Sequence, residues 1–165
     1  MFTLCLYPPS GYLPRQAGFP NDIAIVTLAS NASITQAVKT APLAPVTTLK
    51  SENMTGCVIS GWGHMIGGID GPPSLHPQTT INVISADDCT DKMSNITNAE
   101  IFDHHICVFE TPKAACNGDS GGPLVCDGVL VGVSSYGVRS CTGRFPSIFG
   151  FVPHFYDWIL THMLD

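Results

Sequence analysis

The part of the sequence most suited to chemistry is a serine among glycines: Ser120 stands within Gly118–Gly122, which reads Gly-Asp-Ser-Gly-Gly. Pro123–Cys126 follows and predicts a strand, so the serine would lie in a tight turn before that strand. A serine in such a turn can expose its hydroxyl while neighbouring amides converge on one point, as an oxyanion hole for acyl transfer requires. Gly118 and Ser120 would donate those amides. A bare Gly-x-Ser-x-Gly pattern is equally compatible with an ordinary glycine-rich turn between strands.

The longer string Cys116–Cys126, in which two cysteines bracket Gly-Asp-Ser-Gly-Gly-Pro, resembles the nucleophile motif of the chymotrypsin-like serine proteases. Further stretches match that family in the same order, over residues 19–162. They are the triad-aspartate segment at Asn21–Ala24, the strand opening the second barrel at Cys57–Gly63, the substrate-pairing strand at Ser134–Gly137 and the terminal helix at Phe155–Ile159. The resemblance implies an all-β fold, the chymotrypsin-like double β-barrel with a C-terminal helix. It assigns residues 1–50 to an incomplete, loosely attached first barrel, 51–153 to a complete second barrel and 154–165 to the helix, within one domain truncated at its N-terminus.

The resemblance implies a role for each site residue. Ser120 is the expected nucleophile, Asp22 the carboxylate that orients the catalytic base, and the amides of Gly118 and Ser120 the oxyanion hole. Taken alone, an Asn-Asp pair such as Asn21-Asp22 is more typical of a turn or a cap. In the family, the carboxylate at Asp119 pairs with the amino terminus released by zymogen cleavage. Because an unpaired buried carboxylate is costly, we expect the loop around Gly118 to be disordered or zymogen-like without that partner.

The resemblance also places a substrate pocket whose lining carries no charge. Ala114 corresponds to its base, Gly137 to its neck and Ser147 to a position near the bottom. A trypsin-like enzyme would need a carboxylate where Ala114 stands, because burying a substrate Arg or Lys unpaired is prohibitive. We therefore expect cleavage after Phe, Tyr, Leu or Met; in the simpler alternative, Ala114 and Ser147 are packing residues only. The expected substrate-binding residues are Ala114, Asn117, Ser135, Tyr136, Gly137 and Ser147.

Seven cysteines are many for 165 residues, and their wide separations lack the close Cys-x-x-Cys pairs of structural zinc sites. Disulfides are the better interpretation, and they indicate an oxidising, extracellular compartment. The resemblance leaves Cys5 without a partner and implies the pairs Cys57–Cys126, Cys89–Cys107 and Cys116–Cys141. Sequons for N-glycosylation, which would suit a secreted glycoprotein, stand at Asn31, Asn53 and Asn95.

The catalytic base is the part of the site that the sequence lacks. Serine is a weak nucleophile unless a neighbouring base takes its proton, and the family's histidine lies several dozen residues before the aspartate. Only 21 residues precede Asp22, and none is a histidine. We expect the histidines that are present to be surface or packing residues, and adjacent His104 and His105 to point to opposite faces of a strand rather than share a metal. The histidines are His64, His76, His104, His105, His154 and His162.

Composition argues against several classes of function. The net charge is -6 and the seven Lys and Arg are scattered singly, so no basic stripe favours nucleic acid. No run approaches the roughly 18 apolar residues of a membrane span, and we expect neither a cofactor nor a metal. The expected partners of this monomer are polypeptide substrates and protein inhibitors of proteases. The opening residues lack the basic start and apolar core of a signal peptide, so we expect the natural beginning upstream of Met1.

The 16 Gly and 13 Pro residues indicate short strands joined by tight turns. Asp127-Gly128 predicts a hairpin turn because both residues tolerate positive φ. The strands are expected at 23–28, 57–62, 79–84, 105–109, 123–126, 129–136 and 147–152.

Two helices are expected. Ser85 with Asp88 predicts the capped start of a helix that ends near Met93. Apolar spacing predicts a second helix over 154–164, docked on the barrel through one face, Phe155, Trp158, Ile159 and Met163.

Two functions remain open. The first is a secreted endopeptidase that acts through an acyl-enzyme and whose sequence is incomplete; the second is a non-catalytic homologue that serves as a binding domain. The presence of both Asp22 and Ser120 favours the first, because binding alone needs neither. We expect the chain as given to be inactive. A histidine in an Ala-Ala-His-Cys-like context upstream of Met1 would support the enzyme.

Overall fold

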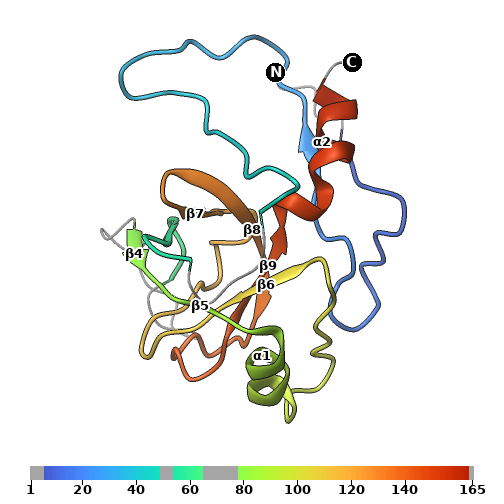
Figure 1. Ribbon diagram of the computed structural model, residues 1–165, viewed down its shortest axis with the longest axis vertical. Helices are drawn as coiled ribbons and strands as arrows, with labels where there is room; N and C mark the ends of the chain where they lie inside the picture. The colour runs from blue at the N-terminus through green and yellow to red at the C-terminus, as the bar shows by residue number, and fades with distance from the viewer. Residues whose placement is uncertain (1–5, 49–53, 65–77, 164–165) are drawn as a thin grey trace.

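The computed structural model describes residues 6–48, 54–64 and 78–163, and Figure 1 shows a curled sheet between two helices. A two-stranded sheet pairs β1 (Leu6–Tyr7) with β2 (Ile25–Val26). A seven-stranded antiparallel sheet has the order β4-β3-β7-β8-β9-β6-β5. Its strands are β3 (Val58–Ser60), β4 (Gln78–Thr80), β5 (Val83–Ile84), β6 (His105–Val108), β7 (Pro123–Cys126), β8 (Val129–Gly137) and β9 (Ser147–Phe151). The helices are α1 (Ala86–Met93), the 3-10 helix η1 (Val152–Phe155) and α2 (Tyr156–Met163).

The seven-stranded sheet closes on itself because its two edge strands are neighbours in the chain. β4 and β5 stand at opposite ends of the strand order, yet Ile81 and Asn82 alone separate them, a connection that spans only about 10 Å. The Ile81 amide still donates to the Cys57 carbonyl beside β3, at 3.0 Å. The Asn82 carbonyl instead accepts from the Phe109 amide after β6, at 2.8 Å. The single strand predicted over 79–84 is therefore wrong, because the chain changes its pairing partner within it.

β7 and β8 form the hairpin that the Asp127-Gly128 pair predicts. Both residues have positive φ, 50° for Asp127 and 82° for Gly128. Cys126 pairs with Val129 across the turn. Two consecutive residues with positive φ give a turn whose twist matches that of the flanking strands. The strands predicted on either side of this turn are confirmed.

β2 is much shorter than the strand predicted over 23–28. The Ile23 amide donates to the Asn21 carbonyl at 2.9 Å, so this end of the segment is a turn. At the other end Leu28 is exposed and lies outside the strand. The strands predicted at 105–109 and 147–152 are present as β6 and β9, each one residue shorter.

The chain that precedes the seven-stranded sheet contributes to its core. Ala44 is buried in the same apolar cluster as Leu124 and Phe149. The Ala44 amide donates to the Leu130 carbonyl at 3.0 Å, and the Leu130 amide donates to the Pro42 carbonyl at 2.8 Å. Contrary to expectation, this part of the chain is thus attached to β8 by backbone hydrogen bonds as well as by burial.

Among the described residues, three disulfides connect segments that are distant in the sequence. They are Cys57–Cys126, Cys89–Cys107 and Cys116–Cys141, the pairs that the resemblance implies. Three residues singled out in the sequence, Cys5, Asn53 and His76, lie outside the described residues.

α1 begins and ends as the sequence predicts. Ser85 is its N-cap, and the Ser85 hydroxyl accepts from the Asp88 amide at 3.1 Å. The helix buries Cys89 and Met93. The disulfide from Cys89 to Cys107 then attaches the helix to β6.

α2 docks on the barrel through only part of the predicted face. Phe155 and Ile159 are buried in a cluster with Ile23, and half-buried Trp158 packs against them. Met163 is 63% exposed, so its predicted burial is wrong. The reason is visible in Figure 1, where the last turn of α2 extends past the barrel.

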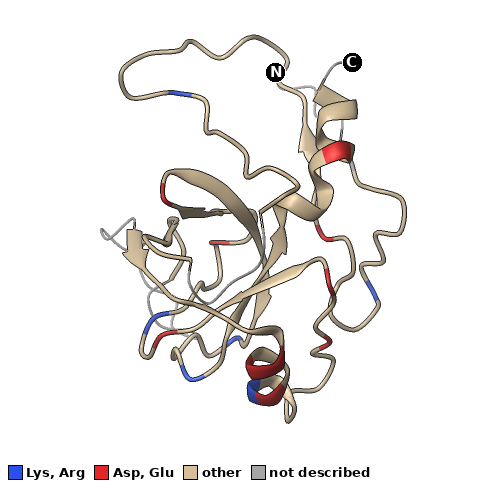
Figure 2. Cartoon of the chain, in the orientation of Figure 1, with Lys and Arg blue, Asp and Glu red and all other residues tan. Residues whose placement is uncertain are grey.

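Charged side chains form no basic surface in the described part of the chain. Figure 2 shows Lys and Arg on separate segments, several of them near acidic residues. No helix among the described residues combines the length and the apolar character that a membrane crossing requires.

The docking of α2 can be tested with two neighbouring residues. Ile159→Ala should lower the free energy of unfolding by about 2–4 kcal/mol, because it removes a buried side chain and leaves a cavity. Leu160→Ala, on the exposed side of the same helix, should change it by less than about 0.5 kcal/mol. Urea denaturation measures both. Equal losses for the two variants would mean that the helix does not dock through the Ile159 face.

Candidate active site

Two consecutive residues of β8 connect Asp22 with the loop that carries Ser120. The Ser135 hydroxyl donates to Asp22 Oδ2 at 2.6 Å. The carbonyl of the preceding residue, Ser134, accepts from the Gly121 amide at 2.9 Å. The strand therefore holds both segments at once. Ser135, expected only as a substrate-binding residue, also orients Asp22.

Several backbone amides of this loop, that of Asn117 among them, have no acceptor among the described residues. The amides of Asp119 and Gly121 donate to carbonyls within the fold, and so does that of Gly122. Among the described residues, no acceptor takes the amide of Gly118 or that of Ser120. Both amides therefore remain available to a ligand beside the exposed Ser120 side chain.

A hydrogen bond on the far side of the loop sets the direction of the Gly118 amide. The Asn117 carbonyl accepts from the His64 amide at 3.0 Å. In a trans peptide the carbonyl and the following N–H point in opposite directions, so this bond turns the Gly118 amide away from His64. Gly118 has φ +100°, and a Cβ there would lie 3.0 Å from the Gly63 Cα, so the position requires glycine.

The Asp119 carboxylate is turned inward and held by two backbone amides. Gly63 donates to Oδ1 at 2.8 Å, and Cys116 donates to Oδ2 at 2.9 Å. A Cβ on either Gly61 or Gly63 would collide with this carboxylate. Each carboxylate oxygen thus has a donor, so the group is not left unpaired; the expectation of a disordered or zymogen-like loop around Gly118 stays a prediction.

A cavity of 730 Å³ lies beside the Asp119 carboxylate. Its wall combines apolar residues such as Ile59 and Phe149 with polar ones such as His64. Ala114 also lines it, so the cavity and the expected substrate pocket share a wall.

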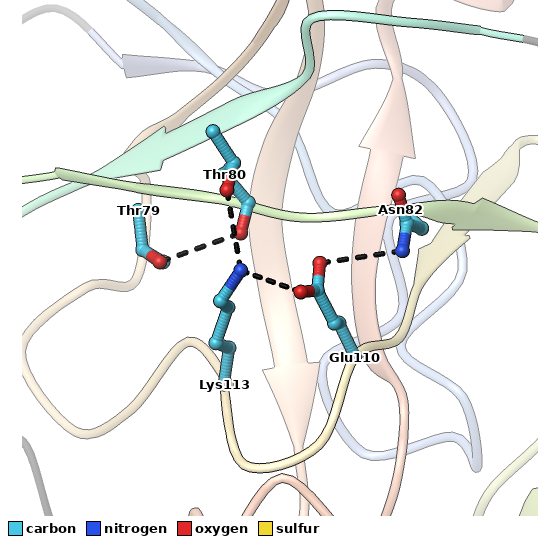
Figure 3. Close-up of polar contacts among 5 residues, drawn as sticks. All are labelled: Thr79, Thr80, Asn82, Glu110 and Lys113. Carbon is cyan, nitrogen blue, oxygen red and sulfur yellow. Dashed lines mark hydrogen bonds and ion pairs between the residues drawn. The ribbon is translucent and has the colours of Figure 1, made fainter.

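A polar network holds the segment that leads into Ala114, as Figure 3 shows. Lys113 Nζ contacts Glu110 Oε1 at 2.6 Å and donates to Thr80 Oγ1 at 3.2 Å. Asn82 Nδ2 donates to Glu110 Oε2 at 3.3 Å. The Lys113 and Glu110 side chains are about a third exposed, and such ion pairs contribute only about 0.2–1 kcal/mol. The network thus positions this segment against the chain around β4 and β5 and adds little stability.

β8 and β9 bring the expected pocket residues together. Gly137 pairs with Ser147 across the two strands. Ser147 Oγ accepts from the Ala115 amide at 3.0 Å. Ala114 and Ser147 line one small space of 10 Å³, and none of the described residues that line it is charged. A space of this size holds about one water molecule. Asn117 stands apart from this space, exposed on the loop before Gly118.

Tyr136 follows Ser135 on β8, and its ring packs against that of Phe19. Its hydroxyl donates to the Glu100 carbonyl at 2.7 Å, and its ring centroid is 5.6 Å from that of Phe19. Burial, and after it the charge of Glu100, raises the pKa of Tyr136 above its ordinary value. Tyr136 therefore remains a neutral hydrogen-bond donor throughout the physiological pH range.

His104 is a supporting residue that the sequence analysis missed. Its Nε2 accepts from the Asn21 amide at 3.0 Å, which requires the tautomer protonated at Nδ1. Asn21 has φ +57° and donates through Nδ2 to the Gly11 carbonyl at 3.0 Å. These bonds fix the left-handed residue directly before Asp22. A separation of 83 residues between His104 and Asn21 leaves no local pattern that could predict the contact.

The prediction that His104 and His105 point to opposite faces of a strand is wrong. β6 begins at His105, so His104 lies in the preceding turn. The two rings pack edge to face, with centroids 4.6 Å apart. The described residues contain no group of three His, Cys, Asp or Glu side chains that could hold a metal ion.

The other described histidines occupy three different surroundings. His64 lines the cavity beside Asp119. His154 is exposed on η1. His162 lies on α2 with its ring 5.1 Å from that of Trp158, between centroids.

Comparison with protein families matches residues 6–159 to the family described as Trypsin. The chain belongs to the trypsin family. It is 36% identical over 155 residues to the chymotrypsin-like serine proteinase of Haliotis rufescens, covering 91% of this chain and 58% of that protein. It is 39% identical over 152 residues to the fibrinolytic enzyme isozyme C of Lumbricus rubellus, covering 87% of this chain and 62% of that protein. The chain thus spans about three fifths of the length of these curated relatives.

A solved structure supports the same fold. Neuropsin, a serine protease expressed in the limbic system of mouse brain, superposes with a TM-score of 0.85 at 26% identity, over 98% of this chain and 71% of neuropsin. The trypsin-type, all-β fold class expected from the sequence is therefore confirmed.

The support that His104 gives to the segment before Asp22 can be tested by substitution. His104→Leu leaves the Asn21 amide without its acceptor and should lower the free energy of unfolding by about 1–3 kcal/mol. His104→Gln supplies a carbonyl oxygen in place of Nε2 and should recover part of that loss. His154→Leu, at an exposed histidine, is the control and should change it by less than about 0.5 kcal/mol. If the Leu and Gln variants at residue 104 unfold at the same urea concentration, the hydrogen bond is not supporting this segment.

Proposed function

We propose that the chain carries the nucleophile of a serine endopeptidase, which hydrolyses peptide bonds through an acyl-enzyme. Ser120 Oγ would attack the substrate carbonyl, and the amides of Gly118 and Ser120 would stabilise the negative charge that develops on its oxygen. The observation that carries this proposal is that the amides of Gly118 and Ser120 have no acceptor among the described residues, beside an exposed serine in a trypsin-family chain.

In this proposal Asp22 orients the catalytic imidazole and stabilises its protonated form. The hydrogen bond from Ser135 at 2.6 Å supports the role, because it holds one carboxylate oxygen and leaves the other for a partner. The bond from Gly121 to Ser134 supports it further, since it places the Ser120 loop next to the same segment of β8.

The general base must come from outside these 165 residues in this proposal. No histidine precedes Asp22, and His104, which lies near it, uses Nε2 to accept from the Asn21 amide. Without a base the Ser120 hydroxyl is a poor nucleophile. We therefore propose that the 165-residue chain alone has little or no peptidase activity.

Asp119 is proposed to receive the amino terminus that activation cleavage releases. Its carboxylate is anchored by Gly63 and Cys116 and borders the cavity of 730 Å³. An ammonium group entering that cavity would meet a carboxylate already aimed by two backbone amides, which favours a charge-assisted hydrogen bond.

The substrate is proposed to be a polypeptide cleaved after an apolar residue. The lining of the space between Ala114 and Ser147 supports this preference, because it holds no carboxylate to pair with a basic side chain. Phe, Tyr, Leu and Met remain the proposed residues before the cleaved bond. Ala114 also lines the cavity of 730 Å³, which offers such a side chain more room than the space of 10 Å³.

The proposed setting is extracellular. Three disulfides support it, because such bonds persist in oxidising compartments. We further propose a monomer whose partners are polypeptide substrates and protein inhibitors of proteases.

The nucleophile assignment can be tested on the protein isolated from its source organism, with a fluorophosphonate probe. We expect the label on the peptide that contains Ser120, together with a histidine in the part of the transcript that precedes Met1. A transcript that starts at Met1 and a product that takes no label would identify the non-catalytic binding homologue instead.

A second assay concerns the 165-residue chain by itself. It should give neither turnover nor a burst with an apolar chromogenic peptide, because no base activates Ser120. A stoichiometric burst that Ser120→Ala abolishes and Ser30→Ala, on an exposed bend, leaves intact would show that the chain contains its own base.

The pocket assignment predicts the order of substrates for the source protein. Peptides with Phe or Leu before the cleaved bond should react on the order of 100-fold faster, as kcat/KM, than matched peptides with Arg, because an unpaired buried cation costs more than about 3 kcal/mol. Ala114→Asp should narrow or reverse that ratio, whereas Ala86→Asp, on α1, should leave it unchanged. Equal rates for Phe and Arg substrates would contradict the assignment of Ala114 to the pocket.

A further inference from the structure

One sequence motif is not accounted for by peptide hydrolysis: the sequon Asn95-Ile96-Thr97, directly after α1. Its residues alternate in the structure. Asn95 and Thr97 are exposed, whereas Ile96 is partly buried and packs against the cluster of Cys89 and Met93. Because Ile96 points inward, the side chains of Asn95 and Thr97, which a glycosyltransferase would recognise, face the solvent.

The backbone of this turn is held by a hydrogen bond, whereas the two polar side chains of the sequon are not hydrogen-bonded to any described residue. The Ile96 amide donates to the Met93 carbonyl at 2.9 Å. Two neighbouring hydroxyls bind the backbone of α1, that of Thr90 and that of Ser94. Within the described part of the chain, the side chains of Asn95 and Thr97 make no such bond.

We propose that Asn95 is an acceptor for an N-linked oligosaccharide. In the transfer, Asn95 Nδ2 forms a bond to the first sugar carbon of a lipid-diphosphate-linked oligosaccharide. The bond from that carbon to the diphosphate oxygen breaks, and the lipid diphosphate leaves as Nδ2 loses one proton. The Asn-x-Thr pattern is the one that the transferase recognises, and an exposed turn lets the folded protein carry so bulky a group.

The surroundings of the turn favour a glycan over a contact with another protein. α1, which ends at this turn, exposes Asp87, Asp88, Asp91 and Lys92, and Figure 2 shows this gathering of charge on the helix. Charged residues are depleted at the centres of protein interfaces. A hydrated oligosaccharide, in contrast, needs no apolar surface beneath it.

The disulfides are independent evidence that the chain passes through the compartment in which this modification occurs. Transfer to asparagine takes place where secreted chains enter an oxidising compartment, and Cys89–Cys107 connects α1, just before the sequon, to β6. Of the other sequons, Asn31 is exposed but lies in a segment without secondary structure, and Asn53 lies outside the described residues. The proposal is therefore confined to Asn95.

The test is cell-free translation of the full chain, directed into microsomes, with Asn31→Gln and Asn53→Gln in every sample so that a single sequon remains. We expect one glycan, seen as a mobility shift that peptide N-glycosidase removes. Asn95→Asp and Thr97→Ala should abolish the shift, and Thr97→Ser should retain it. Asn98→Asp is the matched control: it removes an exposed amide from the same turn, outside any sequon, and should retain the shift.

An unshifted band in the sample that keeps Asn95 would overturn the proposal, as would a shift that survives Thr97→Ala. Because the transfer accompanies translocation, the result does not depend on whether a variant folds. The mobility shift is also independent of the proposed peptidase activity. The chain could carry the glycan and lack activity, or be active and lack the glycan, and the two assays would distinguish these outcomes.

Discussion

The candidate site depends on the hydrogen bonds that β8 makes with two loops from distant parts of the chain. Backbone groups of Ser134 bind Gly121 and Gly122, while the hydroxyl of the next residue, Ser135, binds Asp22. Because these bonds start from consecutive residues of one strand, the separation between the two loops is set by the geometry of a single peptide unit. β8 itself is paired on both sides, with β7 and with β9, so this reference point has little freedom to move.

A second constraint acts from inside the nucleophile loop. The Asp119 carboxylate accepts hydrogen bonds from the amides of Gly63 and Cys116. The Asn117 carbonyl accepts one from the His64 amide. Together these bonds engage the Asp119 carboxylate and the Asn117 carbonyl, while the amides of Gly118 and Ser120 have no acceptor among the described residues. Pre-orientation of this kind matters for acyl transfer, because donors that are already aimed need no reorganisation as charge develops.

Much of this arrangement was predictable from local sequence. The Asp127-Gly128 hairpin and the Ser85 cap act within a few residues, so their geometry follows from side-chain type. The Gly-Asp-Ser-Gly-Gly-Pro string could be recognised by its resemblance to a family, although distant residues hold its conformation. Contacts between distant residues were not predictable: His104 with Asn21 depends on how β6 meets the first segment. The paired amides on Asp119 were missed for a related reason, since the sequence analysis considered only a charged partner. The burial of Met163 failed because helical periodicity defines a face but not how far the barrel reaches beneath it.

The two-residue connection between β4 and β5 has a consequence for how the chain could be altered. Side chains alternate along a strand, so deleting either Ile81 or Asn82 would exchange the inward and outward faces of whatever follows. Val83, now buried, would face solvent, and α1 with its disulfide would be rotated along with it. Ile81 is itself buried, and the hydrogen bonds of the Ile81 amide and the Asn82 carbonyl join this connection to two different parts of the sheet. Both the length and the continuity of this junction are therefore fixed, so insertions and new chain ends belong in exposed turns elsewhere.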